Sequence, residues 1–218
     1  MKRAVIFVNG NFSDLSQAKK IIIKEDCLIA ADGGVKHIFK LGLIPQIIIG
    51  DFDSTPKNMK STPTKIIKYP TKKDKTDFEL TIDYCLAKKF QEIIIFGILG
   101  DRVDHMLANI FLLSKFQTEN PTFKIKIVEG KKEIFILNKE ITINGKIGDE
   151  ISIIPVSEKL EGIVTDGLEY QLNNEVLLFG STRGISNVMN KTSAQITASS
   201  GTGIVIYLKI NSTEIKTT

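Results

Sequence analysis

A short apolar run ends in two carboxylates at residues 47–54, which read IIIGDFDS. Three consecutive isoleucines suit a strand that is buried on both faces, as in a parallel sheet. Ligands of open α/β sheets bind outside the carboxyl ends of the strands, so we expect Asp51 and Asp53 to face such a crevice. In extended backbone both side chains point the same way and can share one hard cation. An Asx turn, with Asp53 or Ser54 capping the next segment, is the alternative. Gly50 favours the functional interpretation, because it indicates that something large approaches the backbone closely.

Three further acidic clusters occupy similar positions, between strand-like runs and helix-like stretches. They are residues 31–34 (ADGG), 74–77 (DKTD) and 100–105 (GDRVDH). If all four clusters meet at one edge of the sheet, seven carboxylates crowd together, which is costly unless a strong positive charge sits among them. Mg²⁺ or another hard cation carrying a phosphate ligand is the usual partner. The sequence therefore predicts a site for a metal and a phosphate.

The pattern of the first 128 residues predicts an α/β domain with a doubly wound, mostly parallel sheet. The expected strands are 4–8, 27–31, 47–49, 65–69, 92–98 and 124–128, and the expected helices are 77–90 and 104–116. Thr76 and Glu79 form a capping box, which places the start of the helix at 77.

The pattern of apolar and polar residues changes near Glu129. Short alternating segments follow at 133–137, 140–143, 150–155, 175–179, 193–197 and 204–210, separated by Asn, Gly, Ser and Thr, without a convincing helix. Residues 129–218 therefore predict an antiparallel β-sandwich, with a barrel as the alternative. The stretch 201–203 (GTG) is expected to be a hairpin turn.

Composition limits the partners and the location. The chain has 218 residues, 42% of them hydrophobic, which suffices for one good core or two small ones. The net charge is +4, and the lysines are scattered without interleaved aromatics, so nucleic acid is not an expected partner.

No apolar stretch approaches the ~20 residues of a membrane span, and the first apolar run is too short for a signal peptide. Cys27 and Cys85 each lie in an apolar pattern, which predicts buried thiols in a reducing, cytoplasmic location.

Two of the acidic clusters carry basic residues as well. Asp77 alone would be a helix-terminal charge worth ~0.5 kcal/mol. The nearby Asp74, in a loop with three lysines, favours a metal-bound polyphosphate, although a solvated loop is the alternative for most of those lysines. Glycines at 97 and 100 lead into Arg102, Asp104 and His105, which together suit a phosphate and ribose clamp. Taken singly, Asp104 would be a helix N-cap and His105 a surface histidine.

The order of these motifs closely resembles the thiamine pyrophosphokinase family. The resemblance rests on residues 32–34, 50–54, 74–79 and 97–109, and it continues in the second half with 167–172 (GLEYQL) and 179–187 (FGSTRGISN). One departure is Asp101, where the family commonly has glycine before the arginine. The first half of the chain contains no P-loop and no dinucleotide-binding fingerprint.

The resemblance implies a direct pyrophosphoryl transfer from ATP to the hydroxyl of thiamine, which gives thiamine diphosphate and AMP. It implies a homodimer in which the sandwich domain binds thiamine near the subunit interface. The implied metal ligands for Mg²⁺ are Asp51, Asp53 and Asp77, and the implied catalytic residues are Asp53, Asp77 and Arg102. The implied nucleotide site comprises Asp32, Gly33, Asp74, Thr76, Gly97, Arg102, Asp104 and His105. The implied thiamine contacts are Ser181, Gly184, Ser186 and Asn187, for which a simple tight turn is the alternative.

Two rival functions use the same residues. The carboxylates alone would also suit another Mg-dependent nucleotide phosphotransferase or hydrolase. A non-catalytic vitamin or nucleotide sensor is the other alternative, and the intact set of acids argues against it, because unmatched carboxylates are a liability in a pocket without metal.

Overall fold

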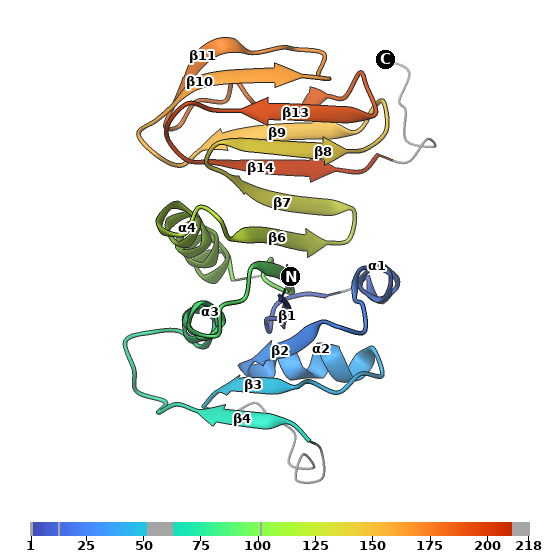
Figure 1. The fold of residues 1–218 in the computed structure, drawn as a ribbon, viewed down its shortest axis with the longest axis vertical. Coiled ribbons are helices and arrows are strands. Elements are labelled where there is room, and N and C mark those ends of the chain that lie inside the picture. Colours follow the sequence, from blue (N-terminus) through green and yellow to red (C-terminus); the bar gives the residue numbers. More distant parts are fainter. Residues whose placement is uncertain (1, 13, 52–62, 101, 211–218) are drawn as a thin grey trace. The chain divides into compact units, whose positions relative to one another are not determined.

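The computed structural model describes residues 2–12, 14–51, 63–100 and 102–210 (Figure 1). The chain forms two compact units. The first unit comprises Met1–Leu112 and Thr122–Gly130, and the second comprises Leu113–Pro121 and Lys131–Thr218. Among the described residues, none of the helices is both long enough and apolar enough to cross a membrane.

The first unit is built on six parallel strands in the order β6-β5-β1-β2-β3-β4. Their bounds are β1 Arg3–Phe7, β2 Cys27–Ala31, β3 Ile47–Gly50, β4 Lys65–Lys68, β5 Glu92–Phe96 and β6 Lys124–Glu129. The order reverses next to β1, since β2 lies on one side of it and β5 on the other. Such a switch point is where ligands bind to sheets of this type. The predicted α/β class with a mostly parallel sheet is confirmed.

Helices cover both faces of this sheet. They are α1 Leu15–Ile21, α2 Val35–Lys40 and α3 Asp77–Ala87, with a 3₁₀ turn η1 at Asp32–Gly34. A further helix, α4 Val103–Glu119, begins in the first unit and ends in the second. Residues of α1 and α2 pack with Val5, Ile48 and Ile94 in one core, while α3 contacts β2 and β3. The alternate strand residues, such as Ile6 and Ile95, are also fully buried. Burial on both faces explains why these strands are continuous apolar runs.

The sequence patterns located α3 and α4 but missed α1 and α2. The N-cap at Thr76 is as predicted, because its hydroxyl accepts a hydrogen bond from the Glu79 N–H at 3.1 Å. The two missed helices have seven and six residues, which is too short for a helical period to stand out.

The second unit contains two antiparallel sheets, with strand orders β12-β9-β14-β7 and β11-β10-β13-β8. Their bounds are β7 Lys132–Leu137, β8 Glu140–Asn144, β9 Glu150–Pro155, β10 Lys159–Asp166, β11 Asn173–Leu178, β12 Asn187–Val188, β13 Ser193–Thr197 and β14 Gly203–Leu208. Residues from both sheets, including Ile153, Val205, Leu160 and Ile196, share one core. The expected sandwich is therefore present.

Two strands and one turn of this sandwich differ from the sequence predictions. The two-residue strand β12 was not predicted. Strand β10 was not predicted, and its pairing with β11 is interrupted by register shifts around Gly162, which has φ +62°. This irregularity hides the period of two in the sequence. The expected hairpin at 201–203 is wrong, because β13 and β14 belong to different sheets and the segment crosses between them.

A buried carboxylate joins the loop before β9 to the end of β14 in the second unit. Asp149 is 3% exposed and accepts hydrogen bonds from the Tyr207 hydroxyl at 2.6 Å, the Lys146 N–H at 2.8 Å and the Ile210 N–H at 2.9 Å. Burial alone would raise the pKa of Asp149, but these hydrogen bonds outweigh burial and hold the pKa below its ordinary value.

Replacing this carboxylate should destabilise the second unit strongly. Asp149→Ala leaves the Tyr207 hydroxyl and two backbone N–H groups without their acceptor, which we expect to lower the free energy of unfolding by about 2–4 kcal/mol. Tyr207→Phe removes one hydrogen bond only and should cost about 1 kcal/mol. Urea unfolding of the two variants tests the ranking, and equal losses would contradict it.

Candidate functional site

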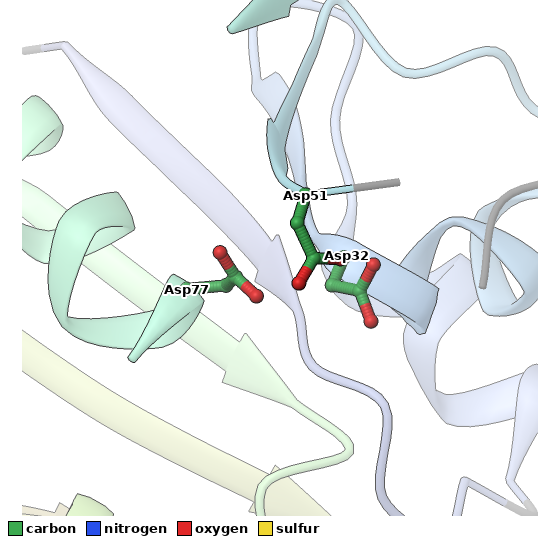
Figure 2. A group of neighbouring side chains, drawn as sticks. All are labelled: Asp32, Asp51 and Asp77. Carbon is green, nitrogen blue, oxygen red and sulfur yellow. The ribbon is translucent and has the colours of Figure 1, made fainter. Parts of the chain in front are cut away.

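Three of the predicted acids meet at the carboxyl ends of neighbouring strands. Asp32 follows β2, Asp51 follows β3 and Asp77 is the first residue of α3. Each offers one carboxylate oxygen, and these three oxygens lie within 4.8 Å of one another (Figure 2). In Figure 2 the Asp77 carboxylate points toward the side chains of the other two. Asp53, the other half of the predicted pair, lies outside the described residues.

A close backbone approach brings Asp32 to this position. Asp32 has φ +44°, a left-handed conformation that aspartate tolerates better than most residues. A Cβ atom on Gly50 would lie 3.1 Å from both the Cα and the Cβ of Asp32. Gly50 therefore gives room to Asp32, a neighbouring residue of the site, whereas the sequence analysis expected something large to approach the backbone there.

The three acids fit a hard divalent cation. Mg²⁺ prefers oxygen ligands at about 2.1 Å in an octahedron, so ligand oxygens lie about 3–4 Å apart, and small side-chain rotations would bring these oxygens into range. The Asp32 Oδ1 atom is buried and accepts no hydrogen bond from the described residues. A buried acceptor without a partner beside two other carboxylates is what a cation site requires.

Lys73 is a positive charge that the structure places beside the cluster. Its Nζ lies 3.0 Å from Asp77 Oδ1 and 4.0 Å from Asp51 Oδ2. Partial burial raises the pKa of Asp77 above its ordinary value, and the charges on Asp32 and Asp51 add to the rise, whereas the ion pair with Lys73 opposes it. The site is therefore under electrostatic stress that a cation relieves.

Two cavities open next to these side chains within the first unit. A cavity of about 450 Å³ is lined by the three acids together with Lys73, Asp74 and Thr76. A second cavity of about 510 Å³ lies at the switch point between β1 and β5, and it is lined by Gly97, Arg102, His37 and Lys36 among others. Val8, Asn9, His105 and Asn109 line both cavities. The two cavities therefore adjoin, which suits an extended ligand.

Most of the predicted nucleotide residues line one of these two cavities, and some of them also have a structural role. Asp32, Asp74 and Thr76 line the acidic cavity, although the Thr76 hydroxyl also caps α3. Gly33 is buried against Asn9, since a Cβ there would lie 2.6 Å from the Asn9 side chain. Gly97, Arg102 and His105 line the cavity at the switch point.

Arg102 and Asp104 form an exposed pair at the start of α4. The Arg102 guanidinium donates to both Asp104 oxygens, at 2.9 and 2.6 Å. This pair holds the pKa of the Asp104 carboxyl well below its usual range. Asp104 lines neither of the two cavities. The interpretation of Asp104 as an N-cap is wrong, because α4 already begins at Val103.

Gly97 has a structural explanation that the sequence did not reveal. Its φ is +69°, and a Cβ atom would lie 2.5 Å from the Val8 carbonyl oxygen. The Gly97 carbonyl in turn accepts a hydrogen bond from the Gly10 N–H at 2.8 Å. The glycine therefore lets the loops after β1 and β5 pack directly on each other at the switch point.

Sequence reasoning missed several residues of the site. Asn9 and Asn109 line both cavities, and Lys36, His37 and Lys40 of α2 line the one at the switch point. A signal for Asn9 existed, because it stands just after the first expected strand. The α2 residues had no such signal, since the helix that carries them was not recognised.

The predicted thiamine contacts lie in the second unit, in and after the loop that follows β11. Ser181 is half-buried, Gly184 is buried against Ile153 and Ser186 is exposed. The Asn187 side chain is engaged with the backbone, because Oδ1 accepts from the Tyr170 N–H at 3.0 Å and Nδ2 donates to the Tyr170 carbonyl at 2.6 Å. Asn187 thus positions this loop through its hydrogen bonds to Tyr170.

The fold and the site define a two-unit α/β protein with a cation-compatible acidic crevice, and comparisons with known proteins narrow the class. Residues 18–127 match the family model described as "Thiamin pyrophosphokinase, catalytic domain", and residues 138–203 match "Thiamin pyrophosphokinase, vitamin B1 binding domain". The chain belongs to the thiamine pyrophosphokinase family.

Relatives match over most of their length. Thiamine pyrophosphokinase of Bacillus subtilis is 34% identical over 187 residues, which cover 83% of this chain and 86% of the relative. A Caenorhabditis elegans relative, thiamin pyrophosphokinase 1, is 26% identical, with 94% and 88% covered. The crystal structure of the Bacillus subtilis enzyme superimposes with a TM-score of 0.85 at 30% identity, covering 96% of this chain and 100% of that one. The crystal structure of thiamin pyrophosphokinase from Geobacillus thermodenitrificans superimposes with a TM-score of 0.82 at 28% identity. The match covers 97% of this chain and 99% of that one.

His37 makes stability depend on pH. The ring is 3% exposed, and its Nε2 lies 2.9 Å from the Gly10 carbonyl oxygen, so the neutral ring donates from Nε2. Burial lowers the pKa of His37 to about 4, although the bond to Gly10 opposes this. The unfolded chain binds this proton near pH 6.5, so stability is present above that pH and falls as the pH drops toward 4.

We therefore expect the wild type to lose up to about 3 kcal/mol more than His37→Gln between pH 7 and pH 4. Urea unfolding at several pH values measures this difference. His105→Gln, which removes an exposed imidazole, is the matched control and should follow the wild-type profile. Parallel curves for the wild type and His37→Gln would show that His37 does not contribute.

Proposed function

We propose that the first unit binds Mg-ATP at the cluster of Asp32, Asp51 and Asp77, and that the chain transfers a pyrophosphoryl group from it to thiamine. In this cluster Asp51 and Asp77 would be metal ligands, and Asp32 would line the nucleotide site. The chain is a transferase of the thiamine pyrophosphokinase family, which converts thiamine to thiamine diphosphate with ATP. The observation that carries the proposed site is the approach of three carboxylate oxygens to within 4.8 Å, inside the region matched by the catalytic-domain model.

The proposed chemistry needs charge neutralisation and positioning more than covalent help. The hydroxyl oxygen of thiamine attacks the β-phosphorus of ATP. The bond between the β-phosphorus and the oxygen that bridges it to the α-phosphorus breaks, and AMP leaves with that oxygen. Asp51, Asp53 and Asp77 would hold Mg²⁺, which supplies positive charge to the phosphate oxygens when bound. Arg102 would bind the transferring phosphates with the guanidinium N–H groups that do not donate to Asp104. A carboxylate of the cluster accepts the hydroxyl proton.

The two adjoining cavities support the proposed nucleotide site. A triphosphate beside Asp32, Asp74 and Thr76 would extend toward Gly97, Arg102 and His105, since the acidic cavity and the cavity at the switch point share lining residues. Asp104 would act through Arg102, because its carboxylate holds that guanidinium at the edge of the cavity. Asn9 and Asn109 add amide groups to both cavities.

We further propose a division of labour along the chain. Residues 1–128 would bind nucleotide and metal, and residues 129–218 would bind thiamine and form the dimer. Ser181, Gly184, Ser186 and Asn187 would contact thiamine, which the match of residues 138–203 to the vitamin B1 binding model supports. A cytoplasmic location is proposed from the thiols of Cys27 and Cys85, neither of which forms a disulfide.

The proposed homodimer is supported by an apolar edge of the second unit. Strand β11 is at the edge of its sheet, and Val176, Leu178 and Phe179 on or just after it are 50%, 56% and 66% exposed. An exposed apolar edge strand is a liability unless another surface covers it. A second copy of the chain is the occupant that the family resemblance implies.

The product of the reaction tests the proposed function. With Mg-ATP and thiamine the wild type should form AMP and thiamine diphosphate, and Asp77→Asn should lower turnover by about 100-fold or more through loss of a charge-stabilising group. Asp83→Asn removes an exposed acid that pairs with Lys75 and is the matched control, with near wild-type turnover. Chromatography of the nucleotides is the measurement. Formation of ADP, or loss of ATP that does not depend on thiamine, would reject pyrophosphoryl transfer.

The proposed dimer has its own test. Phe179→Asp should shift the molar mass in light scattering from dimer toward monomer, because it puts a charge at the apolar edge. Ile147→Asp changes a side chain that is 69% exposed in another loop and should stay dimeric. A monomeric wild type, or a fully dimeric Phe179→Asp, would contradict the proposed interface.

A further inference from the structure

Lys73 is held between two of the three clustered carboxylates. Its Nζ lies 3.0 Å from Asp77 Oδ1, 4.0 Å from Asp51 Oδ2 and 3.1 Å from the Pro70 carbonyl, to which it donates a hydrogen bond. The side chain is only 15% exposed, so water screens these contacts less than it would at the surface. The ammonium group is therefore a positioned charge rather than part of a solvated loop.

The neighbouring Lys75 behaves differently. It pairs with Glu79 at 3.4 Å and Asp83 at 2.6 Å on the exposed side of α3, and its side chain is 47% exposed. The two lysines of this loop thus pair with different acids, and Lys73 is the one that pairs with the cluster. Asp32, Asp51 and Asp77 repel one another at these separations, so a cation beside them stabilises the site.

An ammonium group and a divalent cation compete for the same oxygens. A cation coordinated by Asp77 and Asp51 would share the Asp77 carboxylate with the ammonium, and the two positive charges would repel each other. We propose that Lys73 is the counter-ion of the metal-free site, that the metal displaces it, and that it then binds a phosphate oxygen of the nucleotide. This inference rests on the proposed Mg-ATP site.

The displaced side chain has a place to go. Lys73 lines the 450 Å³ cavity that also contains Asp74 and Thr76, so its flexible stem can turn the ammonium toward an anion in that cavity. When the metal binds alone, the ion pairs of the Lys73 ammonium are broken without replacement. When the metal binds together with the nucleotide, the ammonium gains a phosphate oxygen as a new partner, which offsets that loss. Lys73 thereby makes metal and nucleotide bind cooperatively, since each lowers the cost of binding the other.

The test measures Mn²⁺ binding by electron paramagnetic resonance, without thiamine and without turnover. In the absence of nucleotide, Lys73→Gln should bind Mn²⁺ at least about tenfold more tightly than the wild type, because the competing charge is gone. Lys73→Arg, which keeps the charge, and Lys75→Gln, which removes a charge two residues away, should bind like the wild type. Without metal, Lys73→Gln should also melt at a lower temperature, and Mn²⁺ should restore it.

A second titration uses an ATP analogue with a methylene bridge between the α- and β-phosphorus atoms. The analogue should tighten Mn²⁺ binding in the wild type much more than in Lys73→Gln. Equal Mn²⁺ affinities of the wild type and Lys73→Gln without nucleotide, including no binding by either, would overturn the inference. Formation of AMP from ATP and thiamine by the wild type is scored separately, so failure of the inference is distinguishable from failure of the proposed function.

Discussion

Mutual repulsion among Asp32, Asp51 and Asp77 is the constraint on which the rest of the site depends. Their oxygens lie within 4.8 Å, close enough that the cluster is costly unless positive charge accompanies it. Parallel pairing sets this separation, because the carboxyl ends of β2 and β3 are adjacent and α3 begins beside them. The fold thus holds together charges that would otherwise separate, and a cation of the protein or of the substrate relieves the stress.

Several glycines and one histidine hold the loops around the three carboxylates in place. Gly50 makes room for Asp32, and the turn at Gly97 lets the loops after β1 and β5 close against each other. His37, neutral and hydrogen-bonded to Gly10, lines the cavity at the switch point and contacts the loop after β1. The burial that positions these groups also makes them sensitive to change, because each is packed closely against backbone atoms.

Much of the site followed from sequence, and the reasons for the failures are physical. Buried parallel strands read as continuous apolar runs, so the strand before Asp51 was recognised and the convergence of Asp51 and Asp77 could be inferred. Helices of six or seven residues and a strand bent by a bulge at Gly162 leave no clear period, so α1, α2 and β10 were missed. Lys73 resembles its neighbouring lysines in sequence, and its distances to the carboxylates distinguish it. Asp53 lies outside the described residues, and its role stays a prediction.

The central claim is that these carboxylates form a divalent cation site on a thiamine pyrophosphokinase fold. Anomalous diffraction from crystals grown with Mn²⁺ and the α,β-methylene analogue of ATP tests it most directly. The account predicts an anomalous peak within about 2.3 Å of oxygens from Asp51 and Asp77, with a nucleotide phosphate on the same ion. A peak elsewhere in the protein, with Asp51 and Asp77 still beside Lys73, would contradict it.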